Sequence, residues 1–268
     1  MDALALIDTW SADHAAAACL RPGRVVGGYG PREHDFRWAS VTKPATALAT
    51  LVAAEEGAIE LDEPAGPEGS TVRHLLAHTS GLPFAAGPPI ALPGARRIYS
   101  NQGFEVLAAH VAERTEIPFP EYLAAAVFRP LGMGAELRGS AGSEVHGTLA
   151  DLEALALELL EPTLVAAETL TEAVSVQFLG LKGVLPGIGR FDPLDWGLGF
   201  ELKSHKPGHW SGTRTSPRTF GHFGGAGTFL WVDPERRVAL VCLTDREFAD
   251  WALEAWPAFS DAVLDELQ

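Results

Sequence analysis

The chain has 268 residues, 47% of them hydrophobic, and its 35 acidic and 20 basic residues give a net charge of −15. A chain of this length and composition can bury a sizeable core as one large domain or two closely packed ones, which excludes a disordered protein. The excess of acidic residues argues against nucleic acid and against an anionic membrane surface as partners.

The first eight residues contain no basic side chain and include Asp2 and Asp8, so the N-terminus does not resemble a secretion signal. No stretch approaches the roughly 18 uncharged apolar residues of a membrane span. We therefore expect a cytoplasmic protein with no membrane partner. Cys19 and Cys242 both lie in apolar, strand-like runs, where buried free thiols are expected.

The pattern of apolar residues predicts strands at both ends of the chain. After a short first helix, residues 15–20 and 24–29 are expected to form two strands joined by a turn at Arg21-Pro22-Gly23. Further strands are expected at residues 220–223, 228–232 and 237–244. A closing helix is expected from about residue 248 to residue 267.

Between these ends the periodicity is mainly helical. Helices are expected over residues 44–58, 105–113, 121–128 and 149–160. We therefore predict an α/β (α+β) fold with a central antiparallel sheet, flanked by helices, and an inserted all-helical domain. The sheet domain would comprise residues 1–70 plus 186–268, and the helical domain residues 71–185.

The segment Ser40-Val41-Thr42-Lys43 places a hydroxyl and an amine three residues apart where the helix before Gly57 should begin. Residues at this spacing lie on one helical face, so Lys43 can reach back toward the Ser40 oxygen. Pro44 is compatible with the first turn, where its missing N–H has no intrahelical partner. The pair is a possible nucleophile and base. A helix-capping serine followed by a surface lysine explains it equally well.

Three further segments bear on this choice. They are Val72-Arg73-His74-Leu75-Leu76-Ala77-His78-Thr79-Ser80-Gly81-Leu82-Pro83, Tyr99-Ser100-Asn101 and Gly221-His222-Phe223-Gly224-Gly225-Ala226-Gly227. In this order, and together with the Ser40 segment, they resemble the serine β-lactamase and penicillin-binding-protein superfamily. The resemblance is closest to its class C-like branch of β-lactamases, esterases and D-amino-acid peptidases, and it implies the β-lactamase-like form of the predicted fold.

The resemblance also implies roles for individual residues. Ser40 would be the acylated nucleophile, with Lys43 and Tyr99 as the proton-transfer pair and Asn101 orienting polar groups of the substrate. The backbone N–H groups of Ser40 and Gly225 would form the oxyanion hole. Gly224 and Gly225 lack side chains, so their backbone can approach a substrate closely. No cofactor and no metal ion are implied.

One segment departs from the superfamily pattern. Where relatives commonly have Lys-Thr-Gly, this chain has His222-Phe223-Gly224. The change replaces a permanent ammonium by an imidazole, whose reference pKa is about 6.5, and weakens capture of a substrate carboxylate. His-x-Gly variants occur in esterase-like and aminopeptidase-like members. The resemblance therefore favours ester or amide hydrolysis over efficient β-lactam hydrolysis.

Other signals have simpler interpretations. His74 and His78 are spaced i, i+4, as metal ligands on a helix can be, but they lack an obvious third ligand, and a structural pair is preferred. The basic, hydroxyl-rich stretch over residues 203–220 is expected to be either a rim over the pocket or a solvated loop. Trp210 and Phe84 are predicted to form apolar walls of the substrate pocket.

The sequence therefore predicts a serine hydrolase that acts on a small ester or amide through an acyl-enzyme. The alternative is a catalytically inert binding or regulatory protein that keeps the same pocket. An α/β-hydrolase is disfavoured, because Ser40 lacks the flanking glycines of a nucleophile elbow. The natural substrate and the oligomeric state are left open.

Overall fold

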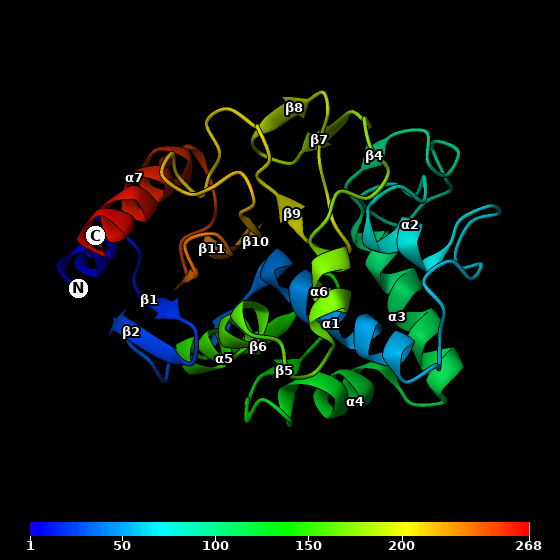
Figure 1. Ribbon diagram of the computed structural model, residues 1–268, viewed down its shortest axis with the longest axis horizontal. Coiled ribbons are helices and arrows are strands. Elements are labelled where there is room, and N and C mark those ends of the chain that lie inside the picture. The colour runs from blue at the N-terminus through cyan, green and yellow to red at the C-terminus, as the bar shows by residue number, and fades with distance from the viewer. Residues whose placement is uncertain (268) are drawn as a thin grey trace.

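The main sheet is built from both ends of the chain. The structure is a computed structural model that describes residues 1–267 (Figure 1). Six antiparallel strands follow the order β2-β1-β12-β11-β10-β9. Their bounds are Ala15–Arg21 for β1, Arg24–Tyr29 for β2, Glu201–Leu202 for β9, Phe220–Gly224 for β10, Thr228–Asp233 for β11 and Val238–Thr244 for β12.

The central strands β10, β11 and β12 are buried along their whole length, and they are mainly apolar because both faces of the sheet are covered. Successive side chains of a strand point to opposite faces, and β12 divides its residues accordingly. Val241 and Leu243 lie in one hydrophobic cluster, whereas Leu240 and Cys242 lie in the other. Cys19 joins this second cluster, and the two cysteines are buried and free, as predicted.

One face of the sheet is covered by the two ends of the chain. The 3-10 helix η1 (Asp2–Trp10) and the closing helix α7 (Asp250–Glu266) pack together there, beside the N and C labels of Figure 1. The Glu266 carboxylate accepts hydrogen bonds from the backbone N–H groups of Asp2 and Ala3 at 2.9 and 2.8 Å. The opposite face is covered by α5 (Leu149–Leu160) and α1 (Thr42–Glu55).

Helix α1 runs through the centre of the molecule, and 12 of its 14 residues are buried. Small side chains are needed there because neighbouring elements pack on every side of it, which explains its alanine-rich sequence. A short 3-10 turn, η2 (Ala39–Val41), precedes it and contains Ser40. Pro44 therefore lies in the first turn of α1, as predicted.

The middle of the chain is mainly helical, but it also contains short strands. The helices are α2 (Val72–Leu76), α3 (Asn101–Thr115), α4 (Phe119–Leu123), the π-helix η3 (Ala124–Phe128) and α6 (Ala167–Ala173). Two small sheets, β3-β6-β5 and β4-β7-β8, have the strands β3 (Phe36–Arg37), β4 (Arg97–Ile98), β5 (Glu136–Leu137), β6 (Val145–Gly147), β7 (Gly183–Leu185) and β8 (Gly189–Phe191).

The mixed fold with a main antiparallel sheet is confirmed. The expected all-helical character of residues 71–185 is not, because β4, β5, β6 and β7 fall within them. Strands of two or three residues leave too little alternation to be predicted from sequence. The boundary expected between residues 185 and 186 also falls inside the β7-β8 hairpin. Over residues 1–267, no helix combines the length and apolarity needed to cross a membrane.

A buried hydrogen bond from β6 to α1 generates a stability prediction. The hydroxyl of Thr42 accepts from the backbone N–H of Val145 at 2.9 Å, and both residues are fully buried. Thr42→Val keeps the side-chain shape but leaves that N–H without an acceptor. We expect the free energy of unfolding, measured by urea denaturation, to fall by about 1–3 kcal/mol.

Thr50→Val in the same helix is the matched control. The Thr50 hydroxyl is equally buried but donates to the Thr46 carbonyl oxygen, which already serves the backbone of α1. Its removal leaves no orphaned backbone group, so the loss should be less than half as large. Equal losses in the two variants would contradict this account of how α1 is tied to β6.

Candidate active site

Ser40 lies where α1 meets the end of β10. The backbone of Ala39 has a φ of 47°, in the left-handed region, which turns the chain from β3 into the helix. Thr228 at the start of β11 donates from its hydroxyl to the Trp38 carbonyl oxygen at 2.7 Å. Gly224 completes the junction, because a Cβ there would lie 2.5 Å from the same oxygen. The Ser40 turn is thus held against the sheet.

Lys43 is the next residue of this site, one turn along from Ser40. It is fully buried, and its Nζ donates to Asn101 Oδ1 at 2.6 Å and to the Gly142 carbonyl oxygen at 2.8 Å. Ser40 Oγ lies 3.4 Å from the same nitrogen. The rings of Tyr99 and Phe104 complete its surroundings, with centroids 4.6 and 5.3 Å away.

These surroundings favour the uncharged amine of Lys43. Burial lowers its pKa well below the usual value, and the charge of Glu105 only partly opposes this. An amine has two N–H groups and one lone pair. The oxygens of Asn101 and Gly142 use the two N–H groups, which leaves the lone pair for Ser40 Oγ. Lys43 can therefore accept the Ser40 proton.

Tyr99 approaches Ser40 from the other side. Its hydroxyl donates to Ser40 Oγ at 2.8 Å. Burial raises the pKa of Tyr99, and the hydrogen bond with Ser40 offsets only part of that effect. The phenol is therefore protonated near neutral pH. Of the predicted proton-transfer pair, Tyr99 is placed to donate a proton and Lys43 to accept one.

His222 differs from the expectation of an imidazole with an ordinary pKa that faces the substrate. It is 1% exposed, and burial lowers its pKa to about 3. Its Nδ1 donates to the Phe223 carbonyl oxygen at 2.7 Å, so Nε2 carries the lone pair. That nitrogen lies 3.5 Å from the Tyr99 hydroxyl. His222 is thus a neutral neighbour of Tyr99, which no sequence signal indicates.

Asn101 is positioned by the N-terminus of α3. Ser100 caps this helix, with its hydroxyl accepting from the Gly103 N–H at 2.8 Å and donating to the Pro83 carbonyl oxygen at 2.6 Å. The Asn101 backbone N–H donates to the carbonyl oxygen of Phe84 at 3.1 Å. The side chain thus contacts Lys43, and a role in orienting substrate remains a prediction.

Gly225 follows β10 beside Ser40. A Cβ at this position would meet no atom within 4 Å, and the residue is exposed. Gly224, in contrast, is buried, and its added Cβ would also lie 2.4 Å from Thr228 Oγ1. The first glycine of the pair therefore allows close packing, and the second leaves open space beside its backbone. An oxyanion hole formed by the backbone N–H groups of Ser40 and Gly225 remains a prediction.

The prediction for Trp210 is wrong. Its side chain is 2% exposed, packs in the second hydrophobic cluster with Trp256 and Phe223, and donates to Glu201 Oε2 at 2.9 Å. Lys206 and His209 contact the same carboxylate, each at 2.7 Å. Much of the stretch over residues 203–220 is therefore folded inward around a buried ion-pair network, which neither the rim nor the solvated-loop interpretation anticipates.

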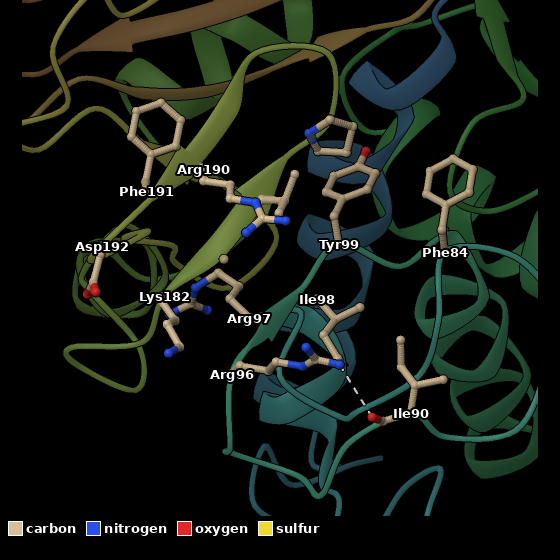
Figure 2. A pocket seen from close by; sticks show the side chains of 13 residues that line it. Phe84, Ile90, Arg96, Arg97, Ile98, Tyr99, Lys182, Arg190, Phe191 and Asp192 are labelled. Carbon is tan, nitrogen blue, oxygen red and sulfur yellow. Dashed lines mark hydrogen bonds between the residues drawn. The ribbon is translucent and has the colours of Figure 1, made fainter.

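Phe84 does line a pocket, of about 840 Å³, next to Tyr99 (Figure 2). Its ring is 53% exposed and lies parallel to the Tyr99 ring, with centroids 6.0 Å apart. The opposite wall comes from the β7-β8 hairpin. Four basic residues line this pocket: Arg97, which is buried, and Arg96, Lys182 and Arg190, which are exposed. No motif would have indicated the three exposed ones in sequence.

His74 and His78 take separate partners. His74 Nδ1 lies 2.9 Å from the Thr71 hydroxyl at the start of α2. His78 Nδ1 accepts from the Ser100 backbone N–H at 3.1 Å, and its ring packs against Tyr99 with centroids 4.5 Å apart. Both contacts are structural, and His78 fixes the segment that carries Tyr99.

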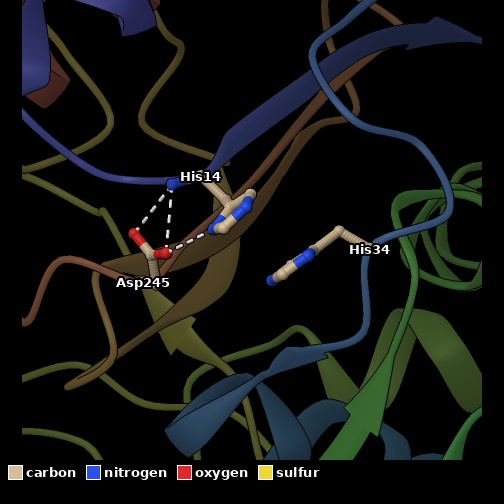
Figure 3. A group of neighbouring side chains, drawn as sticks. All are labelled: His14, His34 and Asp245. Carbon is tan, nitrogen blue, oxygen red and sulfur yellow. Dashed lines mark hydrogen bonds and ion pairs between the residues drawn. The ribbon is translucent and has the colours of Figure 1, made fainter.

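A separate group, His14, His34 and Asp245, lies at the ends of β1 and β12 (Figure 3). The two imidazoles stack with centroids 4.0 Å apart, and the Asp245 carboxylate accepts from the backbone and ring nitrogens of His14 at 3.0 and 2.8 Å. The carboxylate thus holds the start of β1 against the end of β12. None of the three contacts Ser40, Lys43 or Tyr99.

Comparisons with known proteins identify the family and the fold of the chain. A sequence model of the family described as Beta-lactamase matches residues 11–135 and 134–262. A crystal structure of a beta-lactamase from Mycobacterium bovis is 52% identical, with a TM-score of 0.97 and coverage of 98% of both chains. The hydrolase EstCE1, described as having promiscuous acyltransferase activity, is 18% identical, with a TM-score of 0.78 and coverage of 96% of this chain and 95% of that one.

A curated relative matches a shorter region. Penicillin-binding protein 4* of Bacillus subtilis (strain 168) is 29% identical over 131 residues, which make up 37% of this chain and 29% of that protein. The match of the family model to most of the chain, and the M. bovis structure, confirm the resemblance carried by the motifs. The chain belongs to the beta-lactamase family, a family of hydrolases.

Proposed function

We propose that the protein is a serine hydrolase that cleaves a small ester or amide through an acyl-enzyme on Ser40. The observation that carries the proposal is the environment of Ser40 Oγ, with the Tyr99 hydroxyl at 2.8 Å and Lys43 Nζ at 3.4 Å. A serine hydroxyl needs a base before it can attack a carbonyl carbon near neutral pH. A helix-capping serine followed by a surface lysine would need neither a buried amine nor a phenol hydroxyl beside its oxygen.

Acylation follows from the protonation states. Ser40 Oγ bonds to the carbonyl carbon of the substrate while its proton passes to the Lys43 amine. The N–H groups of Ser40 and Gly225 stabilise the tetrahedral oxyanion. When the intermediate collapses, the bond to the alcohol or amine breaks, and the leaving group takes a proton from the Tyr99 hydroxyl. The ammonium of Lys43 supplies the proton that restores Tyr99.

Deacylation uses the same base with water as the nucleophile. The sequence contains no match to the glutamate-bearing loop that class A relatives use for this step. Lys43, again an amine, accepts a proton from the water and returns it to the Ser40 oxygen as the acyl bond breaks. One base thus serves both half-reactions.

A first prediction concerns covalent labelling. Exposure to a fluorophosphonate should add one adduct to the intact mass of the wild type and none to Ser40→Ala. Turnover of p-nitrophenyl butyrate should fall at least about a thousandfold in Ser40→Ala. Ser175→Ala, which changes an exposed serine, is the control and should label normally. A wild type that forms no adduct would favour an inert binding protein.

A second prediction concerns pH. Lys43 must lose its proton to act as the base, so kcat/KM for a neutral ester should rise with pH through the lowered pKa of Lys43. It should level off well below the reference lysine pKa of about 10.4. Tyr99→Phe should keep this rise but lower the plateau about a hundredfold. A rise that continues to about pH 10 would contradict a neutral Lys43.

A third prediction concerns substrate class. A neutral, buried His222 offers no positive charge to the carboxylate of a β-lactam. Loss of one charge-assisted hydrogen bond costs roughly 1.5–3 kcal/mol. We therefore expect kcat/KM for p-nitrophenyl butyrate to exceed that for nitrocefin by at least about tenfold. Faster hydrolysis of nitrocefin would show that another group binds the lactam carboxylate.

A further inference from the structure

The pocket in Figure 2 shares one residue, Tyr99, with the site around Ser40. Tyr99 lines it with its ring, and the hydroxyl of the same side chain donates to Ser40 Oγ at 2.8 Å. The opposite wall is the β7-β8 hairpin, which β4 holds in place by parallel pairing of Arg97 with Gly183. Ser40 is not among the residues that line the pocket, so a substrate bound at Ser40 would have to pass Tyr99 to enter this space.

The pocket walls combine exposed apolar side chains from different segments. Phe84, Ile90 and Val184 are 53%, 54% and 48% exposed, and all three line it. Large apolar side chains that gather on a surface around a concave site indicate a ligand with an apolar part. The volume of about 840 Å³ exceeds what the acyl group of a simple acetate would fill.

The charge around this apolar space is positive, although the whole chain carries −15. Arg96, Lys182 and Arg190 line the pocket and are exposed, and within residues 1–267 none forms an ion pair with a carboxylate. Asp192 is the one acidic residue of the described lining. Figure 2 shows Arg190 extended from its strand toward Tyr99, while the carboxylate of Asp192 points away. Cations left unpaired in so acidic a chain favour an anionic ligand.

We propose that this pocket binds an apolar substrate segment that ends in an anionic group, so that the preferred substrates are amphiphilic monoanionic esters or amides. The inference rests on the proposed function of Ser40. It assigns anion binding to the rim formed by Arg96, Lys182 and Arg190, because His222 is buried and neutral. Phe84, Ile90 and Val184 would contact the apolar segment.

Turnover of matched esters tests the proposal. One series compares p-nitrophenyl monoesters of succinic, adipic and suberic acid with neutral p-nitrophenyl esters of the same chain lengths. A second series carries the carboxylate on the alcohol side, as butyryl esters of ω-hydroxy acids. In at least one series, kcat/KM should favour the anionic member and increase with chain length, because each buried methylene contributes about fourfold.

The variant set is a triple substitution of Arg96, Lys182 and Arg190 to Gln. The matched control changes Arg24, Arg129 and Arg218 to Gln, three exposed arginines that lie outside this pocket and form no ion pair among the described residues. Both sets remove three positive charges. The ratio of anionic to neutral kcat/KM should fall about tenfold in the first set and stay unchanged in the second, since each exposed pair contributes about two- to fivefold.

Binding to the inactive Ser40→Ala protein separates this proposal from the function itself. Octanoate should bind more tightly than octanol by calorimetry, and the pocket substitutions, but not the control set, should remove the difference. A ratio and a binding difference that both survive the pocket substitutions would overturn the proposal, even if ester turnover and Ser40 labelling remain. Loss of labelling with normal octanoate binding would overturn the hydrolase and leave the anion site.

Discussion

A lysine buried without a carboxylate partner is the constraint on which the site depends. Within residues 1–267, the hydrogen-bond partners of the Lys43 nitrogen are neutral oxygens, those of Ser40, Asn101 and Gly142. An ammonium there would lose its hydration without a compensating anion, so the amine is favoured. Three separate parts of the fold must meet to create this environment: the start of α1, the capped start of α3 and the turn before β6. The central helix α1 and two segments from the mainly helical middle of the chain are therefore all needed to make one base.

The sheet contributes the other half of the site. Gly224 lets β10 pack against the turn before Ser40, and His222 on the same strand stays neutral beside the Tyr99 hydroxyl. Neutral groups thus surround the reacting hydroxyl, and the positive charge lies farther out, on Arg96, Lys182 and Arg190 at the pocket rim. This separation distinguishes proton transfer at Ser40 from the proposed recognition of an anion. It also explains why a single histidine in place of lysine changes the expected substrate.

The sequence was sufficient to predict the main strands and helices, because each long element carries an apolar pattern of its own. The order of the motifs was sufficient to predict that Ser40, Lys43, Tyr99 and Asn101 lie in one site. It could not reveal Gly142, whose contribution is a backbone carbonyl that any residue possesses. Trp210 was misassigned because a polar stretch around it hides the buried Glu201 network. The pocket lined by Arg96, Lys182 and Arg190 could not be predicted, because it depends on pairing between β4 and β7. Both strands are too short to show an alternation of apolar and polar residues.

The protonation state of Lys43 is the most direct test of the account. The chain has only four lysines, so the side-chain amines can be labelled with ¹⁵N and assigned by single substitutions to methionine. In an NMR titration, Lys43 should be an uncharged amine near neutral pH and gain its proton only at lower pH, because burial lowers its pKa. A lysine with the reference pKa of about 10.4 would instead be an ammonium over the same range. If Lys43 stayed an ammonium up to about pH 10, it could not be the base that activates Ser40.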